Sequence, residues 1–86
     1  MGVVEDLADD LARETLVLMA EMDDGRFFYE VAKVVGASSP TLEEAYLTAM
    51  RVRMASVRGR KFLDATLKAL RDGMAPPAAP RDSSGH

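Results

Sequence analysis

Cysteine is absent from this chain of 86 residues, and the one histidine, His86, is its last residue. Without cysteine the chain forms no disulfide bond and has none of the Cys/His spacings that hold structural zinc. No internal histidine or cysteine is available to activate a serine, threonine or tyrosine hydroxyl as a nucleophile. We therefore expect a protein that is not an enzyme and that holds neither a metal ion nor a cofactor.

Long apolar runs are also missing. The longest, Leu16–Ala20, is far shorter than the roughly 20 residues that span a bilayer. Residues 1–15 are acidic and lack the basic start of a signal peptide. The absence of cysteine also fits a reducing compartment. These features predict a soluble cytoplasmic protein that does not bind a membrane.

The charges are separated along the chain, although the net charge is only −3. Residues 1–24 hold eight acids and one base, whereas residues 25–86 hold ten bases and six acids. Such asymmetry can mark a surface for nucleic acid or for another anionic partner. The interpretation we favour is that an acidic first helix packs beside a basic third helix.

Helix-forming residues dominate the chain, and no alternating β-branched run indicates a strand. Apolar residues at helical spacing predict helices at about residues 3–22, 26–35 and 40–72. The predicted fold is therefore all-α, a small bundle of three helices in a single domain, residues 1–72. Residues 73–86, GMAPPAAPRDSSGH, are rich in proline and serine and predict a disordered tail.

Local signals place the ends of these helices. Asp23-Asp24-Gly25 is expected to stop the first helix, because glycine accepts the left-handed conformation that closes a helix, and Gly36 and Gly73 are expected to end the other two. Ser39 before Pro40 predicts an N-cap for the third helix. Thr41 and Glu44 form a second possible capping box a little later in the chain.

The third predicted helix is long for such a small domain. Unbroken, it would cover about 33 residues and about 50 Å, whereas a compact domain of this size has a radius of gyration of about 11 Å. On a helical wheel, the bulky apolar residues before Gly59 share one face, and those after it share a face about half a turn away. We therefore expect a kink or break near Gly59 and a C-terminal half that packs on another subunit. The candidate protein interface comprises Met50, Met54, Val57, Phe62, Leu63, Leu67 and Leu70.

Size gives a second reason to expect a homodimer. Domains this small bury only about 60% of the surface of their unfolded chain. Because no disulfide or metal is available to compensate, self-association or a protein partner is the expected source of further stability. The sequence does not identify such a partner.

The stretch VAKVVGASSPTLEEAYL, residues 31–47, has the spacing of two helices joined by a tight turn. Ala32 is small where the first helix would be approached closely, and Gly36 lies where the chain turns. Leu42 and Ala45 are apolar where the second helix would pack back. Over about residues 28–47 the chain resembles the bacterial helix-turn-helix motif. The resemblance implies a DNA-binding regulator whose second helix enters the major groove.

Glu43 and Glu44 oppose DNA binding, because DNA affinity comes mainly from lysine and arginine at the phosphates. The basic residues of the third helix would supply such contacts, but they form two stripes that point in nearly opposite directions. Under this alternative the candidate nucleic-acid contacts are Ser38, Ser39, Thr41, Arg51, Arg53, Arg58, Arg60 and Lys61.

Taken together, these patterns favour a non-catalytic regulatory or adaptor module that acts through protein–protein interaction and self-association. Its methionine, leucine and aromatic side chains would form the contact, and the separated charges would orient it. The alternative hypothesis is a helix-turn-helix transcriptional regulator or a nucleic-acid-binding accessory protein.

Overall fold

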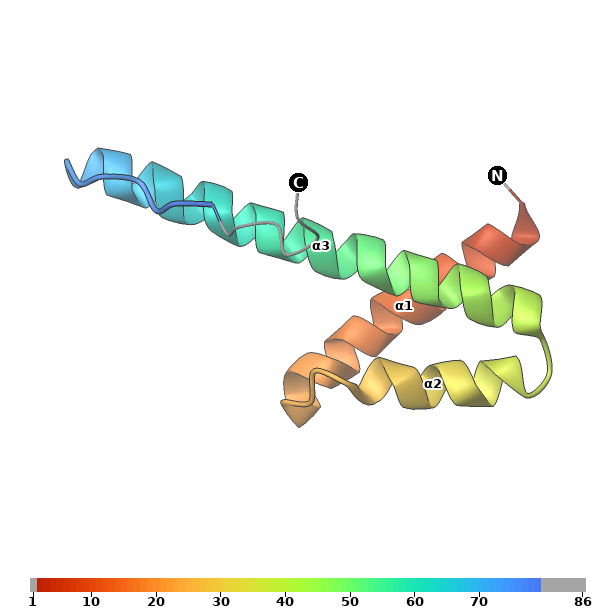
Figure 1. Cartoon of the computed structure of the whole chain (residues 1–86). Helices are drawn as coiled ribbons and strands as arrows, with labels where there is room; N and C mark the ends of the chain where they lie inside the picture. The colour runs from red at the N-terminus through yellow and green to blue at the C-terminus, as the bar shows by residue number, and fades with distance from the viewer. Residues whose placement is uncertain (1, 80–86) are drawn as a thin grey trace. The chain divides into compact units, whose positions relative to one another are not determined.

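The computed structural model describes residues 2–79, and this part of the chain contains three α-helices. Helix α1 spans Val3–Met22, α2 spans Phe27–Gly36 and α3 spans Pro40–Arg71 (Figure 1). No strand occurs among residues 2–79. The predicted all-α fold of three helices is confirmed, and each boundary lies within one residue of the prediction.

Contacts among the described residues divide the chain into two compact units, which separate between Ala55 and Ser56. The first unit holds α1, α2 and the first half of α3. The second unit holds the other half of α3 and the segment that follows it. The sequence had suggested one domain over residues 1–72.

Helix α3 continues through Gly59 without interruption. Of the two alternatives expected at this position, a broken helix is therefore wrong, whereas a kink stays a prediction. The physical reason is that glycine in a helix interior costs only about 1 kcal/mol relative to alanine. Strong helix formers on both sides of Gly59 compensate for that cost.

The end of α1 differs from the prediction in one detail. Asp23, and not Gly25, takes the left-handed conformation, with φ of 53°. The Asp24 amide donates to the Met19 carbonyl at 3.3 Å, which closes the last turn. The Asp24 carboxylate then accepts from the Arg26 amide at 2.9 Å. Aspartate tolerates the left-handed region and bonds nearby backbone amides, so the turn does not require glycine.

The turn between α2 and α3 is three residues long, Ala37–Ser39. The Ser39 hydroxyl oxygen accepts from the Leu42 amide at 3.1 Å, and Pro40 is the first helical residue. The first of the two predicted caps is therefore the one that forms. Helix α2 ends at Gly36 as expected, but Gly36 has no positive φ.

Helix α3 ends at the predicted glycine. Gly73 has φ of 69°, its amide donates to the Leu70 carbonyl, and the Met74 amide donates to the Ala69 carbonyl at 2.8 Å. This pair of bonds is a Schellman motif. The following segment turns back beside the same helix (Figure 1), where Met74 and other tail residues line a shallow hollow with Ala65 and Ala69. The rest of the predicted tail, residues 80–86 with His86, lies outside the described residues.

The buried core lies in the first unit and is small. It combines four residues of α1, two of α2 and two of α3, and three of the eight are alanines. Alanine lets helix backbones approach closely but removes little apolar surface from water. The core residues are Ala8, Ala12, Thr15, Met19, Phe28, Ala32, Tyr46 and Met50.

A chain of two hydrogen bonds crosses this core. The hydroxyl of Tyr46, which is completely buried, donates to Thr15 Oγ1 at 2.9 Å. Thr15 Oγ1 in turn donates to the Leu11 carbonyl at 2.7 Å. Because the tyrosine hydroxyl is paired, its burial avoids the cost of an unsatisfied polar group.

No helix among residues 2–79 combines the length and apolar character needed to cross a bilayer.

Candidate protein-binding surface

The seven residues of the predicted interface fall into two groups. Met50 is completely buried, and Met54 is half-buried against the same core. Both methionines therefore belong to the interior of the first unit, and Met50 offers no surface to a partner. A helical wheel shows which residues share a face but not what covers that face, so it did not separate these two methionines from the exposed residues.

The other group lies in the second unit and is mostly exposed. Leu63, Leu67 and Leu70 are 58%, 47% and 62% exposed, and Phe62 is half-buried beside them. We call Phe62, Leu63, Leu67 and Leu70 the leucine stripe. Val57 is also exposed but lies outside the arc of the stripe, about 80° beyond Leu67 at 100° per residue.

The segment after α3 does not cover the leucine stripe. The hollow that it forms on α3 is lined by Ala65, Lys68, Ala69 and Asp72, and none of the stripe residues takes part. Lys68 Nζ lies 3.7 Å from a carboxylate oxygen of Asp72 on this other side of the helix. The stripe is therefore an uncovered apolar surface among the residues that the structure describes.

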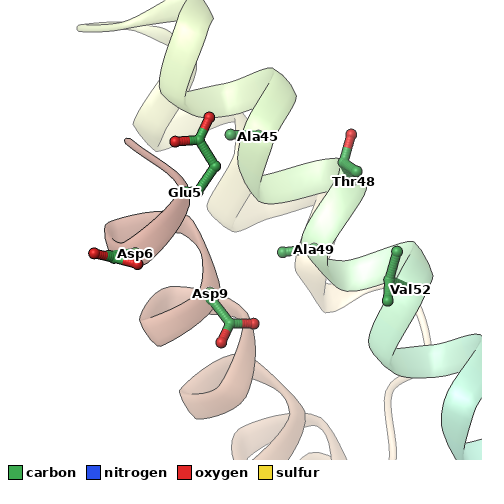
Figure 2. A pocket seen from close by; sticks show the side chains of 7 residues that line it. All are labelled: Glu5, Asp6, Asp9, Ala45, Thr48, Ala49 and Val52. Carbon is green, nitrogen blue, oxygen red and sulfur yellow. The ribbon is translucent and has the colours of Figure 1, made fainter. Parts of the chain in front are cut away.

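A groove in the first unit was not anticipated from the sequence. Its volume is about 590 Å³, and it lies between the N-terminal half of α1 and the first half of α3 (Figure 2). We call it the α1/α3 groove. Figure 2 shows Asp9 between the two helices and the methyl groups of Ala45 and Ala49 directed toward α1. The lining residues are Glu5, Asp6, Asp9, Ala45, Thr48, Ala49 and Val52.

The two walls of the α1/α3 groove differ in chemistry. The α1 wall carries three carboxylates, whereas the α3 wall carries no charge. The Glu5 carboxylate accepts from the Gly2 amide at 3.1 Å, so it also serves the N-terminus of α1. Asp6 makes no ion pair within residues 2–79. The sequence signal for this groove is the spacing of Ala45, Ala49 and Val52, which a search for bulky residues overlooks.

An ion pair joins α1 to α3 at the end of the groove. Arg53 donates to both carboxylate oxygens of Asp9, with both distances 2.7 Å. The paired guanidinium lowers the pKa of Asp9, and the same hydrogen bond raises the pKa of Arg53. This contact agrees with the interpretation that the acidic first helix packs beside the basic third helix.

The residues proposed for nucleic-acid contact occupy different environments. Arg53 is bound to Asp9, and the Ser39 hydroxyl caps α3, so neither group is free. Glu43, which the helix-turn-helix resemblance directs toward the DNA groove, lies against Gly36: a Cβ at Gly36 would be 2.6 Å from the Glu43 carboxyl carbon. The exposed candidates are Ser38, Thr41, Arg51, Arg58, Arg60 and Lys61.

Within the described residues, no three acidic or histidine side chains converge where they could hold a metal ion. Tyr46 has a raised pKa, because burial outweighs the opposing effect of its hydrogen bond with Thr15. A buried tyrosine with a satisfied hydroxyl is a structural element of the core. The two candidate surfaces of the described residues are the leucine stripe and the α1/α3 groove.

No protein-family model, curated protein or solved structure matches this chain.

Proposed function

We propose that the chain is a non-catalytic cytoplasmic interaction module that binds protein through its leucine stripe. The observation that carries the proposal is the exposure of Leu63, Leu67 and Leu70 on one side of a single helix. Single exposed leucines are common on protein surfaces, but several that adjoin one another mark an interaction site.

The distribution of charge on this half of α3 supports the same function. At about 100° per residue, Phe62 and Leu67 bound an arc of about 140°. The six charged residues between Val57 and Arg71 all fall outside that arc: Arg58, Arg60, Lys61, Asp64, Lys68 and Arg71. Amphipathic helices commonly bind another protein by laying their apolar side in a hydrophobic groove of that protein.

Photocrosslinking tests this proposal. A photoreactive phenylalanine analogue replaces Leu67 in one protein and Val34 in a control; Val34 is 75% exposed on α2. We expect crosslinks to protein, either to a second copy or to another chain, from position 67 only. They should disappear when Leu63→Ser and Leu70→Ser are added. Equal crosslinking from both positions, or none from position 67, would refute the proposed function.

A titration with random-sequence duplex DNA at low salt tests the helix-turn-helix alternative. With Arg53 and Ser39 engaged inside the protein, we expect no salt-dependent binding. If binding is observed, falls steeply with salt and is weakened by Arg51→Gln and Arg58→Gln, the regulator hypothesis replaces ours. Arg13→Gln, at an exposed position on α1, is the matched control.

A further inference from the structure

We propose that the leucine stripe of each copy docks in the α1/α3 groove of a second copy, so that two chains form a closed antiparallel dimer. This inference rests on the proposed function and names its partner. It is carried by three observations: the spacing of uncharged residues along α3, their sizes, and the opposite charges of the two surfaces.

The spacing is that of a coiled-coil seam. Positions along α3 alternate by four and three residues without a charge, from the α3 wall of the groove to the leucine stripe, with three small or polar residues among them. A helix with such a repeat places one uncharged side against a partner helix. The positions are Ala45, Ala49, Val52, Ser56, Gly59, Leu63, Thr66 and Leu70.

The sizes of these residues favour an antiparallel pair. The first half of the series holds no residue larger than valine, and both leucines of the series, Leu63 and Leu70, lie in its second half. An antiparallel pair centred between Val57 and Arg58 places each leucine opposite a smaller residue, whereas a parallel pair would leave a gap at one end. Close packing of large against small residues is the arrangement that fills a core. The opposed pairs are Ala45 with Leu70, Ala49 with Thr66, Val52 with Leu63, and Ser56 with Gly59.

The charges favour the same direction. Residues 1–55 hold eleven acids and five bases, a net charge of −6. Residues 56–79 hold five bases and two acids, a net charge of +3. An antiparallel pair brings the basic half of α3 beside the acidic α1 of the other copy, whereas a parallel pair brings two basic halves together. Complementary charge of this kind fixes the register and orientation of an interface.

The side of α3 that carries Arg71 agrees with this arrangement. Arg71 follows Arg53 by eighteen residues, which is five full turns of an ideal helix, so the two have the same phase in the helical repeat. Arg53 marks the side on which α1 packs, because it binds Asp9. In a two-fold antiparallel pair, equivalent flanks of the two helices lie on the same side of the pair. The proposed register therefore places Arg71 beside the α1 wall of the partner, which carries Asp6, a residue without an ion pair within residues 2–79.

Disulfide trapping tests the register in a chain that has no cysteine of its own. Val52→Cys and Leu63→Cys are prepared as separate variants and then mixed under oxidising conditions. The antiparallel pair predicts a disulfide between the two variants and little within either one. A homodimeric disulfide in Leu63→Cys alone indicates a parallel pair and overturns the inference.

Sedimentation over a range of protein concentrations separates failure of the inference from failure of the proposed function. We expect concentration-dependent dimers that Leu67→Ser weakens at least tenfold and that Val34→Ser leaves unchanged. A monomer at every concentration that still gives stripe-dependent crosslinks to another protein overturns the inference alone. A monomer that gives no such crosslinks overturns both.

A charge exchange tests the contact between the two surfaces. At low ionic strength, Asp6→Lys and Arg71→Glu should each weaken the dimer about three- to tenfold. Mixing the two variants should restore most of the loss, because both symmetric contacts of the mixed dimer then join opposite charges. Glu14→Lys, outside the groove, is the control for net charge. Equal weakening by Glu14→Lys, or no recovery on mixing, contradicts the proposed docking.

Discussion

The two halves of α3 show how differently similar residues behave within one helix. Between Pro40 and Ala55, Tyr46 and Met50 are completely buried against α1 and α2. Between Ser56 and Arg71, leucines of comparable size stay about half exposed. The second half is held as a helix by its own composition, by the Schellman motif at Gly73 and by hydrogen bonding along the helix. Apolar character alone therefore does not reveal which side chains stabilise the isolated fold.

The largest expected effect comes from truncating a buried side chain in the first half of α3. The same kind of truncation at an exposed side chain in the second half is the comparison. Met50→Ala should lower the free energy of unfolding by about 2–4 kcal/mol, because it removes a fully buried side chain and leaves a cavity. Leu63→Ala should change it by less than about 0.5 kcal/mol in dilute protein, since Leu63 is exposed there. Urea denaturation of dilute protein measures both. Equal losses would show that the second half is also covered in the monomer.

Tyr46→Phe sharpens the contrast by removing one polar contact from the buried half. We expect a loss of about 1–2 kcal/mol, because Thr15 Oγ1 loses the hydrogen bond that Tyr46 donates. The pKa of Tyr46 is raised above 10.0, so the unfolded chain releases this proton first. Stability contributed by neutral Tyr46 is therefore present below pH 10.0 and is lost as the pH rises through the higher folded pKa.

This alkaline loss should be absent in Tyr46→Phe. Tyr29, which is 39% exposed on α2, provides the control: Tyr29→Phe should keep the alkaline response of the unmodified chain. Urea midpoints between neutral and alkaline pH distinguish the two variants. A wild-type response that survives in Tyr46→Phe would contradict the assignment to Tyr46.

Gly59→Ala tests the exposed half through its backbone. No atom lies within 4 Å of a Cβ built at Gly59, so alanine is accommodated without a clash. We expect a gain of about 0.5–1 kcal/mol in dilute protein from the higher helix propensity of alanine. Circular dichroism at 222 nm and urea denaturation measure the effect. A loss of stability in the monomer would show that Gly59 supports a bend that alanine resists.

Three features of the fold follow from local sequence. The Ser39 cap, the start of α3 at Pro40 and its end at Gly73 depend on a few neighbouring residues, and the structure has all three as predicted. The left-handed residue after α1 was misassigned to Gly25. Asp23 takes this role, and the Asp24 carboxylate stabilises the turn by accepting a hydrogen bond from the Arg26 amide. A general preference for glycine at helix ends does not predict this contact.

The candidate surfaces were predictable only in part. The leucine stripe was found, because apolar spacing on a helix is visible in the sequence. Met50 was assigned to the same interface, because the wheel does not show that α1 and α2 cover it. The α1/α3 groove was missed entirely, since it exists only once α1 packs beside Ala45 and Ala49. Surfaces made by two elements depend on tertiary packing that a single sequence does not display.

The smallest expected effect lies at the exposed ion pair between Asp9 and Arg53. Because the folded pKa of Asp9 is lowered below 3.8, its contribution is present above that pH and is lost as the pH falls through the folded pKa. The free energy of unfolding should therefore fall less steeply at acid pH in Arg53→Gln than in the unmodified chain; we call this acid dependence the acid limb. Arg60→Gln, in the exposed half of α3, should leave the acid limb as in the unmodified chain. The same acid limb in both variants would show that Asp9 gains nothing from Arg53 in solution.

The three core alanines have a consequence for how this chain varies in evolution. Ala8, Ala12 and Ala32 are at most 3% exposed, so a larger side chain at any of them would collide with closely packed neighbours. Within a single chain, the exposed leucines are not limited in this way. Divergent relatives should therefore conserve a sparse signature of small residues, with Ala8 and Ala12 one helical turn apart, while their bulky residues change. Such relatives would be recognised by the positions of their small residues.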